Sequence, residues 1–209
     1  MQLYEKYRPQ TLSEFVGQDK VKMQVERLMS RSGWDRDALW VQGPSGTGKS
    51  SMALILARMV AKDLFILELD GDKCNVEAVR ELETTLNLVA PDSWRVVIVN
   101  EAHSMTSRSV QAWLTLLERL PRHTLIIFTT TELLSEDLFG QFSGPFGSRC
   151  KVFSFTNQNL CQAFARRAQE IAQAENLDGQ PLEKYVRLVK DCRNNFRQVL
   201  QRIDSCEMI

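Results

Sequence analysis

Residues 39–50 read LWVQGPSGTGKS, which places a glycine-rich turn directly after a short apolar run. Residues 43–50 match the pattern GxxxxGK[ST] in full, and residues 51–62, SMALILARMVAK, continue with an apolar helical face. Glycines let a backbone curl until its N–H groups converge on phosphate oxygens, and the following helix adds the positive end of its dipole. A glycine turn can match this pattern by accident, but the flanking strand and helix favour a phosphate-binding loop.

The residue types in this turn also indicate the ligand. Lys49 would reach the β- and γ-phosphates of a nucleotide, and the Ser50 hydroxyl would be a ligand of Mg²⁺. We therefore expect ATP and Mg²⁺ as cofactors. The residues expected to hold the phosphates are Gly43, Pro44, Ser45, Gly46, Thr47, Gly48, Lys49, Ser50 and Ser51.

Outside this turn, apolar runs alternate with helical patterns. Runs rich in Val, Ile, Leu and Phe predict strands buried on both faces at 39–42, 64–69, 95–99, 124–128 and 151–155. Helical spacing predicts helices near 19–31, 49–61, 75–88 and 107–119. This alternation predicts an α/β fold with a five-stranded parallel sheet and helices on both of its faces.

Two other regions of the chain follow different patterns. Residues 137–148 carry three glycines and a proline, which predict a loop with exposed aromatic side chains. After residue 156 only helical patterns follow, at about 157–175, 181–191 and 194–205. We therefore expect an α/β domain over residues 1–156 and a small helical domain over residues 157–209.

The composition excludes several classes of protein. With 44% hydrophobic and 25% charged residues, the chain is neither collagen-like, disordered nor a disulfide scaffold. Its 26 basic and 26 acidic residues balance, so net charge gives no argument for nucleic acid or membrane binding. The five cysteines form no CxxC pair, and the N-terminus is polar and charged. We expect a soluble intracellular protein with reduced thiols and no membrane partner.

The third predicted strand leads into NEAH at 100–103. In ATPases with this kind of loop, a carboxylate at the strand end orients the Mg²⁺ shell and the next glutamate polarises the attacking water. Glu101 suits the second role, although a solvated carboxylate at a helix start is the alternative. Asn100 keeps a carbonyl oxygen for a metal-bound water but loses a negative charge, which predicts weaker Mg²⁺ retention and slower hydrolysis. We expect His103 to be structural or exposed rather than catalytic.

Several motifs together resemble the clamp-loader branch of the AAA+ ATPases, most closely the small subunits of replication factor C. YEKYRP at 4–9 with FVGQ at 15–18 is similar to that family's adenine-contacting box. SRC at 148–150 is similar to its arginine motif, and NNFR at 194–197 falls where the helical lid supplies a second sensor arginine. The resemblance runs from Tyr4 to about Gln201.

The resemblance implies an AAA+ P-loop NTPase fold followed by a helical lid domain. It implies that the adenine is lined by residues of the N-terminal box, namely Tyr7, Arg8, Pro9 and Val16. Arg149 would act on the nucleotide of a neighbouring subunit, and Arg197 would complete the chain's own site. Taken alone, Arg149 is equally well a surface cation and Arg197 one basic residue of an amphipathic helix. The expected catalytic residues are Lys49, Glu101, Thr131, Arg149 and Arg197.

Four features depart from the family pattern. Asn100 replaces the usual acidic residue, and Thr131 stands where a sensor asparagine is usual. The segment 137–148 is longer than the corresponding loop of the family. The sequence ends at Ile209, before the helical collar expected of the family.

By resemblance, the function is that of a Mg²⁺-dependent ATPase subunit of a DNA polymerase sliding-clamp loader in DNA replication, located in the cytoplasm or a nucleus. Its partners would be other loader subunits in an oligomeric ring, the sliding clamp and primer–template DNA. Lys73, Arg80 and Arg108 are the expected contacts to DNA phosphates. Asn100 and Thr131 leave open a nucleotide-binding scaffold with little hydrolysis, and the fold leaves open another DNA-remodelling AAA+ ATPase.

Overall fold

The computed structural model describes residues 1–87, 94–133, 143–177 and 179–207. Its centre is a parallel five-stranded sheet in the order β2-β3-β4-β1-β5, which confirms the predicted sheet. The strands are β1 Arg36–Gln42, β2 Ile66–Asp70, β3 Arg95–Asn100, β4 Thr124–Thr130 and β5 Lys151–Ser154.

Two strands begin at other residues than the sequence predicts. β1 begins at Arg36 rather than at residue 39, because its polar first residues pair with the start of β4. Leu64 lies in the 3-10 helix η1 (Asp63–Phe65) instead of in a strand, and it is 87% exposed. The prediction that all five strands are buried on both faces is wrong for β2, an edge strand in which Leu67 is 44% exposed.

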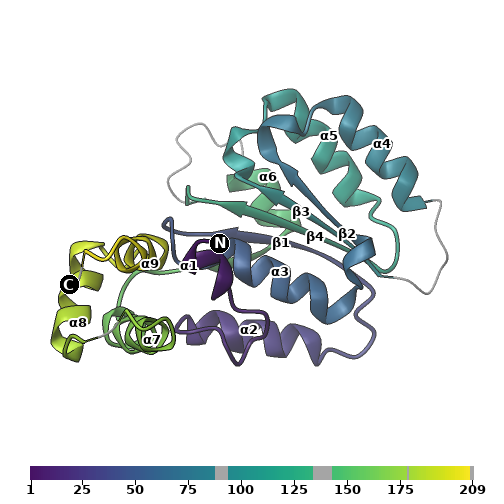
Figure 1. Cartoon of the computed structure of the whole chain (residues 1–209). Helices are drawn as coiled ribbons and strands as arrows, with labels where there is room; N and C mark the ends of the chain where they lie inside the picture. The colour runs from purple at the N-terminus through teal and green to yellow at the C-terminus, as the bar shows by residue number, and fades with distance from the viewer. Residues whose placement is uncertain (88–93, 134–142, 178, 208–209) are drawn as a thin grey trace.

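Helices cover both faces of the sheet (Figure 1). One face packs against α2 (Asp19–Met29) and α3 (Lys49–Val60), and the other against α4 (Val76–Asn87) and α5 (Ser107–Glu118). Successive strand residues point to opposite faces, so Leu39 joins the core beneath α3 while Trp40 joins the core beneath α5. Both cores are built from residues that are almost completely buried, which holds the strand ends rigidly.

A sixth helix, α6 (Ser143–Arg149), occupies part of the expected loop. Phe146 is fully buried, with ring centroids 4.9 Å from Trp40 and 5.0 Å from Phe128, so the prediction of exposed aromatics is wrong there. Gly144 and Gly147 weaken helix propensity, but burial of the Phe146 ring outweighs this cost. Residues 137–142 of the expected loop lie outside the described residues.

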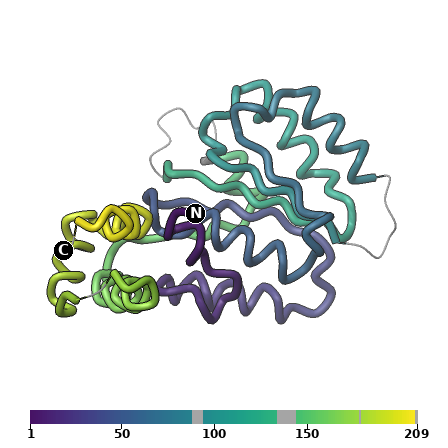
Figure 2. The backbone as a smooth tube through the Cα atoms, in the orientation of Figure 1, coloured from purple at the N-terminus to yellow at the C-terminus, as the bar shows by residue number. Residues whose placement is uncertain are grey.

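The helices after β5 are α7 (Cys161–Ala174), α8 (Leu182–Asp191) and α9 (Phe196–Asp204). They pack around a third core that contains Phe164, Tyr185 and Val199. The short helix α1 (Leu3–Lys6) joins this core through Leu3, so the start of the chain lies beside α9 (Figures 1 and 2). A four-residue helix is too short for sequence periodicity to reveal. None of the helices in the described ranges is both long and apolar enough to span a bilayer.

Replacing Phe146 with alanine should lower the free energy of unfolding by about 3–5 kcal/mol, because it empties the space between Trp40 and Phe128. Denaturant unfolding followed by circular dichroism measures the loss. The control Leu64→Ala removes an exposed side chain and should change stability by no more than about 0.5 kcal/mol. Equal effects of the two substitutions would contradict the packing described for α6.

Candidate active site

A cleft of about 600 Å³ lies between the phosphate-binding loop, the ends of β2 and β3, and helices α1, α7 and α9. This volume suits a small-molecule ligand, and ligands of open α/β sheets bind beyond the carboxyl ends of the strands. Most of the predicted site residues line the cleft: Tyr7, Arg8, Pro9, Val16, Ser45, Gly46, Thr47, Gly48, Lys49, Ser50, Ser51, Asn100, Glu101, Thr131 and Arg197. Gly43, Pro44 and Arg149 do not line it.

The loop conformation depends on glycine at two positions. Gly46 and Gly48 have φ angles of +73° and +98°, in the left-handed region. A Cβ atom at Gly48 would lie 2.5 Å from the Phe15 ring, and one at Gly46 would overlap the Asn195 side-chain amide. The loop is therefore held between the N-terminal segment and α9, at the N-terminus of α3.

Lys49 is the first residue of α3 and is only 7% exposed. Its ammonium donates to the carbonyl oxygens of Gly43 at 2.7 Å and Pro44 at 2.9 Å. Burial lowers the pKa of Lys49 to about 8, the Glu101 carboxylate acts in the opposite direction, and Arg197 adds to the lowering. Gly43 and Pro44 thus do not line the cleft, but their carbonyl groups hold the Lys49 ammonium in the loop.

Helix α9 contacts the loop directly. The Phe196 N–H donates to the Gly46 carbonyl at 3.2 Å, while the Asn195 side chain caps α9 by accepting from the Gln198 N–H at 3.2 Å. The guanidinium of the next residue, Arg197, lies over the Tyr4 ring at 5.5 Å from its centroid. This cap and stacking contact place Arg197 on the wall of the cleft.

The N-terminal box also contacts α3. Arg8 donates from Nε to the Ser51 hydroxyl at 3.3 Å. Burial lowers the pKa of Arg8, and the charge of Glu68 opposes that effect. The cleft therefore holds Arg8 close to the phosphate-binding loop, where Lys49 and Arg197 also present cationic groups to a ligand. A fourth cationic residue of the lining, Arg167, is paired with Glu170.

The acidic end of the cleft is at the carboxyl end of β3. Asn100 Oδ1 accepts a hydrogen bond from the Thr129 hydroxyl at 3.1 Å. Asn100 Nδ2 donates to a carboxylate oxygen of Glu68 at 3.4 Å. Glu101 follows in the left-handed region with a φ of +51°. One lone pair of Asn100 Oδ1 remains for a further donor.

Glu68 is a carboxylate of the cleft that the sequence analysis missed. It lies on β2, two residues before Asp70, which pairs with Asn100 in the sheet. Alternate residues of a strand share a face, so the strand register was the signal that could have grouped Glu68 with Asn100. This signal requires knowing that β2 and β3 are neighbours.

The oxygen atoms of the cleft suit a hard cation that arrives with phosphate. Within the described ranges no three His, Cys, Asp or Glu side chains form a cluster able to hold a metal. Ser50, Asn100, Glu68 and Glu101 nevertheless offer hydroxyl, amide and carboxylate oxygens to the same cleft. Mg²⁺ typically keeps several waters and binds through one or two protein groups together with substrate phosphates. This donor set fits such an ion.

The opposite end of the cleft is aromatic. Tyr7 and Val16 line it there, together with Tyr4 and with Phe164 and Phe196, whose ring centroids are 4.8 Å apart. Sequence patterns do not identify either phenylalanine as a lining residue, although Phe196 lies in the NNFR segment, because both come from helices α7 and α9, which are distant in sequence from the box. The aromatic lining suits the planar face of a base.

Contacts with Glu175 tie the box to the end of α7. The Tyr7 hydroxyl and the Lys6 ammonium both donate to the Glu175 carboxylate. The hydrogen bond to Glu175 raises the pKa of Tyr7, and the Lys6 contact lowers the pKa of Glu175. These contacts fasten α1 and the Tyr7 ring beside the cleft.

Arg149 lies outside the cleft, at the end of α6, where it pairs with Glu118 of α5. Its guanidinium also donates to the Pro145 carbonyl at 3.1 Å. The structure therefore does not bring Arg149 together with the other predicted catalytic residues of the same chain. Arg149 is thus an exposed arginine on a different surface, with its charge paired by Glu118.

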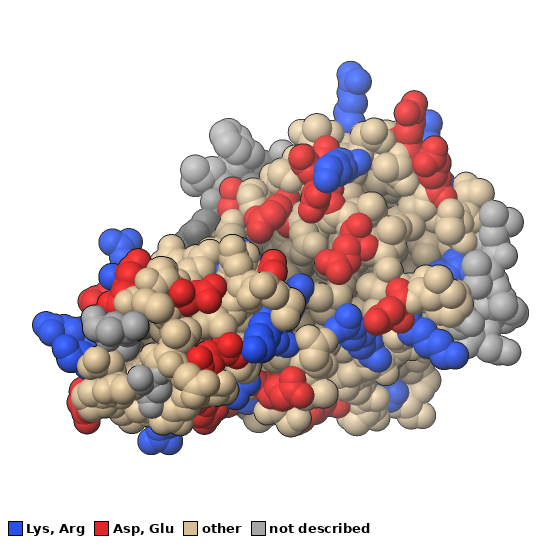
Figure 3. Space-filling view, in the orientation of Figure 1, with Lys and Arg blue, Asp and Glu red and all other residues tan. Residues whose placement is uncertain are grey.

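The predicted DNA-contacting residues lie on exposed surfaces. Lys73 forms an ion pair with Asp70 at 2.7 Å, while Arg80 and Arg108 are exposed on α4 and α5. Figure 3 shows basic and acidic side chains interspersed on the face it draws, without a continuous basic stripe. Because Asp70 already neutralises the charge of Lys73, this ion pair argues against Lys73 as a contact to DNA phosphate.

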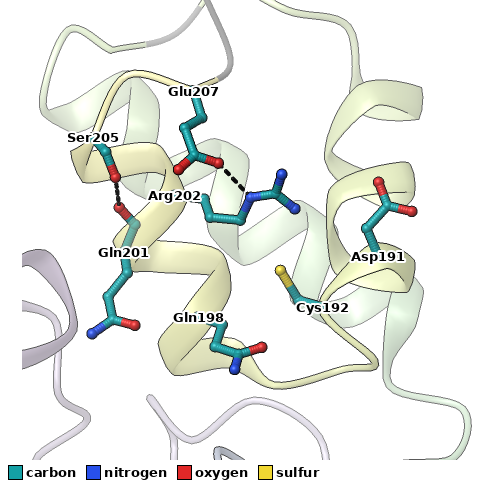
Figure 4. A pocket seen from close by; sticks show the side chains of 7 residues that line it. All are labelled: Asp191, Cys192, Gln198, Gln201, Arg202, Ser205 and Glu207. Atoms are coloured by element: carbon teal, nitrogen blue, oxygen red, sulfur yellow. Dashed lines mark hydrogen bonds and ion pairs between the residues drawn. The ribbon is translucent and has the colours of Figure 1, made fainter.

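A second hollow lies at the outer end of α8 and α9 (Figure 4). Arg202 forms an ion pair with Glu207 at 2.6 Å across it, beside Cys192 and Asp191. None of the predicted site residues line this hollow. The chemistry-bearing motifs therefore converge on the larger cleft.

The pKa of Lys49 predicts how nucleotide binding depends on pH. Only the charged ammonium attracts phosphate, so affinity for ATP should be greatest below about pH 8 and should fall as pH rises through that value. The fall should not exceed about tenfold per pH unit for one proton. Calorimetry in buffers of different ionisation enthalpy should show proton uptake on binding near pH 8.5 (about half a unit above that pKa), because the phosphates raise the lysine pKa again.

The Lys49→Met variant provides the control for this prediction, since it removes the titrating group. It should bind ATP more weakly and without proton uptake. Proton uptake that persists in Lys49→Met, or affinity in the unchanged protein that does not vary between about pH 7 and about pH 9 (about one unit below and above the Lys49 pKa), would contradict the assignment.

Comparison with known proteins places this geometry in context. A replication factor C small subunit from Pyrobaculum arsenaticum is 31% identical over 182 residues, which cover 84% of this chain and 53% of that protein. The DNA polymerase III subunit gamma/tau of Mycoplasma pneumoniae is 28% identical over 230 residues, which cover 97% of this chain and 32% of that protein. The chain thus spans about half the length, or less, of these relatives.

The fold has a counterpart among solved structures, and the sequence matches a family model. The RuvB Holliday junction branch migration motor of Thermotoga maritima superposes with a TM-score of 0.71 at 18% identity, over 94% of this chain and 64% of that chain. At this identity the likeness shows the AAA+ P-loop NTPase fold alone. Residues 39–153, more than half of the chain, match the model for the ATPase family associated with various cellular activities (AAA). The chain belongs to this AAA family of ATPases.

Proposed function

We propose that this chain is an ATP-binding and ATP-hydrolysing subunit of a DNA polymerase sliding-clamp loader that acts in DNA replication. One observation carries the proposal: the N-terminal box, the phosphate-binding loop, the acidic strand end and Arg197 line a single cleft, while Arg149 lies outside it. The similarity to a replication factor C small subunit and to DNA polymerase III gamma/tau supports a clamp loader among AAA functions. The partners are other loader subunits, the sliding clamp and primer–template DNA.

In this proposal the residues of the cleft divide the binding of ATP between them. The aromatic end formed with Tyr7 and Val16 takes the adenine, and the N–H groups of residues 45–50 with the Lys49 ammonium take the phosphates. Lys49 exchanges the Gly43 and Pro44 carbonyls for phosphate oxygens. We also propose that residues 1–156 and 157–209 are two domains, with the ligand held between them.

The oxygens of Ser50 and Asn100 would hold Mg²⁺ with the nucleotide, and the ion would supply charge neutralisation to the phosphates. Asn100 contributes its carbonyl dipole where a carboxylate would contribute a full charge. Glu101 takes a hydrogen bond from the attacking water and polarises it. The Thr131 hydroxyl, directly after β4, and Arg197 on α9 complete the site.

Arg149 acts in trans in this scheme. An arginine that reaches the transferred phosphoryl group offsets the negative charge of the transition state. Because Arg149 lies on α6, outside its own cleft, a neighbouring subunit must present its cleft to it. Hydrolysis would then occur only in the assembled ring.

The Asn100 amide favours a second candidate, a nucleotide-binding scaffold subunit with little hydrolysis. It offers no negative charge to the Mg²⁺ shell, and its Nδ2 faces Glu68. Intact Lys49, Ser50 and Glu101 in the same cleft favour the hydrolysing subunit. The fold likeness to RuvB does not favour branch migration, because it rests on 17–18% identity.

The Asn100→Asp variant tests whether the amide at position 100 limits ATP hydrolysis. It should raise the ATP turnover rate at limiting Mg²⁺ by on the order of tenfold, because a carboxylate orients metal-bound water more strongly than an amide. The control Asn75→Asp adds the same charge at the cap of α4 and should leave turnover unchanged. Equal rates for the unchanged protein and Asn100→Asp would show that position 100 does not limit the metal site.

A single-turnover measurement on the chain assembled with the other loader subunits, in the presence of a sliding clamp and primed duplex DNA, tests the proposed function. ATP hydrolysis should rise when both are present, and Arg149→Ala should lose at least about 10³-fold in rate while retaining ATP binding. Arg122→Ala is the matched control, because Arg122 is also an exposed arginine paired with an acid, Asp35. Stimulation by four-way junctions but not by clamp and primed DNA would contradict the clamp-loader proposal.

A further inference from the structure

His103 lies between two parts of the cleft wall without lining the cleft itself. It belongs to the 3-10 helix η3 (Ala102–Ser104), directly after β3, and its side chain is 26% exposed. Nδ1 is 3.1 Å from the Thr130 hydroxyl at the end of β4, and Nε2 is 3.5 Å from a carboxylate oxygen of Glu101. The imidazole thus joins the two strand ends that carry Glu101 and Thr131.

The surrounding polar groups favour one position for the proton of the neutral ring. The Thr130 hydroxyl accepts from the Glu132 N–H at 3.1 Å, so its own proton is available to His103 Nδ1. A neutral imidazole that accepts at Nδ1 carries its proton on Nε2. The Nε2–H then faces the Glu101 carboxylate, whereas the other tautomer would set a nitrogen lone pair against it.

The Glu101 carboxylate has few contacts that fix its position. Its side chain is 59% exposed. Among the residues that the structure describes, His103 is the only side chain within ion-pair or hydrogen-bonding distance of its carboxylate. A carboxylate that activates a water must hold one defined position. If its side chain samples several rotamers, the rate of the reaction falls.

We propose that His103 is a positioning residue for ATP hydrolysis: its Nε2–H orients the Glu101 carboxylate, and the Thr130 hydroxyl orients the ring. This inference rests on the proposed hydrolytic function and adds a residue to it. It also couples the glutamate to the β4 segment that carries Thr131, because Thr130 and Glu132 flank that residue. A movement of Thr131 would therefore be transmitted through Thr130 and His103 to the Glu101 side chain.

Nitrogen NMR of the imidazole tests the arrangement without any turnover. The chain has two histidines, so a spectrum of the His123→Asn variant assigns the signals of His103. Long-range proton–nitrogen correlations should show the Nε2–H tautomer for His103 in the neutral protein. The Thr130→Val variant, which removes the hydroxyl but keeps the shape, should reduce that preference. A dominant Nδ1–H tautomer in the unchanged protein would overturn the proposal.

Kinetics test the role itself. His103→Ala should lower kcat by about tenfold, the scale of one hydrogen bond to a charged group, while leaving the ATP dissociation constant unchanged. His103→Gln should recover most of the rate, because its amide N–H can reach Glu101. Thr130→Val should slow hydrolysis in the unchanged background and have no further effect in His103→Ala. The matched control is His123→Asn, which replaces the other histidine, at the start of β4, and should hydrolyse normally.

Different outcomes would overturn the positioning role of His103 and the proposed hydrolytic function. If His103→Ala hydrolyses ATP at the unchanged rate, or if His103→Gln is as slow as His103→Ala, the positioning role is wrong and the proposed function stands. If the unchanged protein, assembled with the other loader subunits, binds ATP but gives no turnover in the presence of clamp and DNA, the hydrolytic function is wrong, and with it any role for His103 in hydrolysis.

Discussion

Backbone crowding at the turn between β1 and α3 determines where every other group of the site can lie. The Phe15 ring packs against Gly48, and the Asn195 amide packs against Gly46, where no side-chain atom would fit. These two contacts press the turn between the N-terminal segment and α9. The turn then sets Lys49 at the start of α3 and brings Phe196 to the Gly46 carbonyl. A bulkier residue in the turn would move the loop and α9 together.

Charge accumulates around this turn in a way that favours an anionic ligand. Arg197 lowers the pKa of Lys49 and also that of Arg8, although burial is the larger cause for both. Glu101 and Glu68 offset part of this effect from the other side of the cleft. Three cations converge where a triphosphate would bring compensating charge, so ligand binding and the protonation of Lys49 are linked. The geometry of the turn and the electrostatics of the cleft thus point to the same ligand.

The sequence could predict the parts of the site that are contiguous. The turn at 43–50 and the NEAH segment at 100–103 each follow a buried strand, and parallel strands bring their carboxyl ends to one edge. Glu68, Phe164 and Phe196 escaped because they join the cleft only through strand order and helix packing. Helix α6 escaped because its glycines and proline resemble a loop, and the burial of Phe146 became visible only in three dimensions. The roles of Arg149 and Arg197 came from family resemblance and stay predictions.

A crystal structure of the protein with a non-hydrolysable ATP analogue and Mg²⁺ tests the central claim most directly, namely that this turn binds the triphosphate. The account predicts phosphates at the N-terminus of α3, with Lys49 Nζ moved from the Gly43 and Pro44 carbonyls onto phosphate oxygens and Arg197 turned toward the ligand. An analogue seated in the hollow beside Arg202, or a loop that keeps Lys49 on its own carbonyls with the analogue elsewhere, would contradict it.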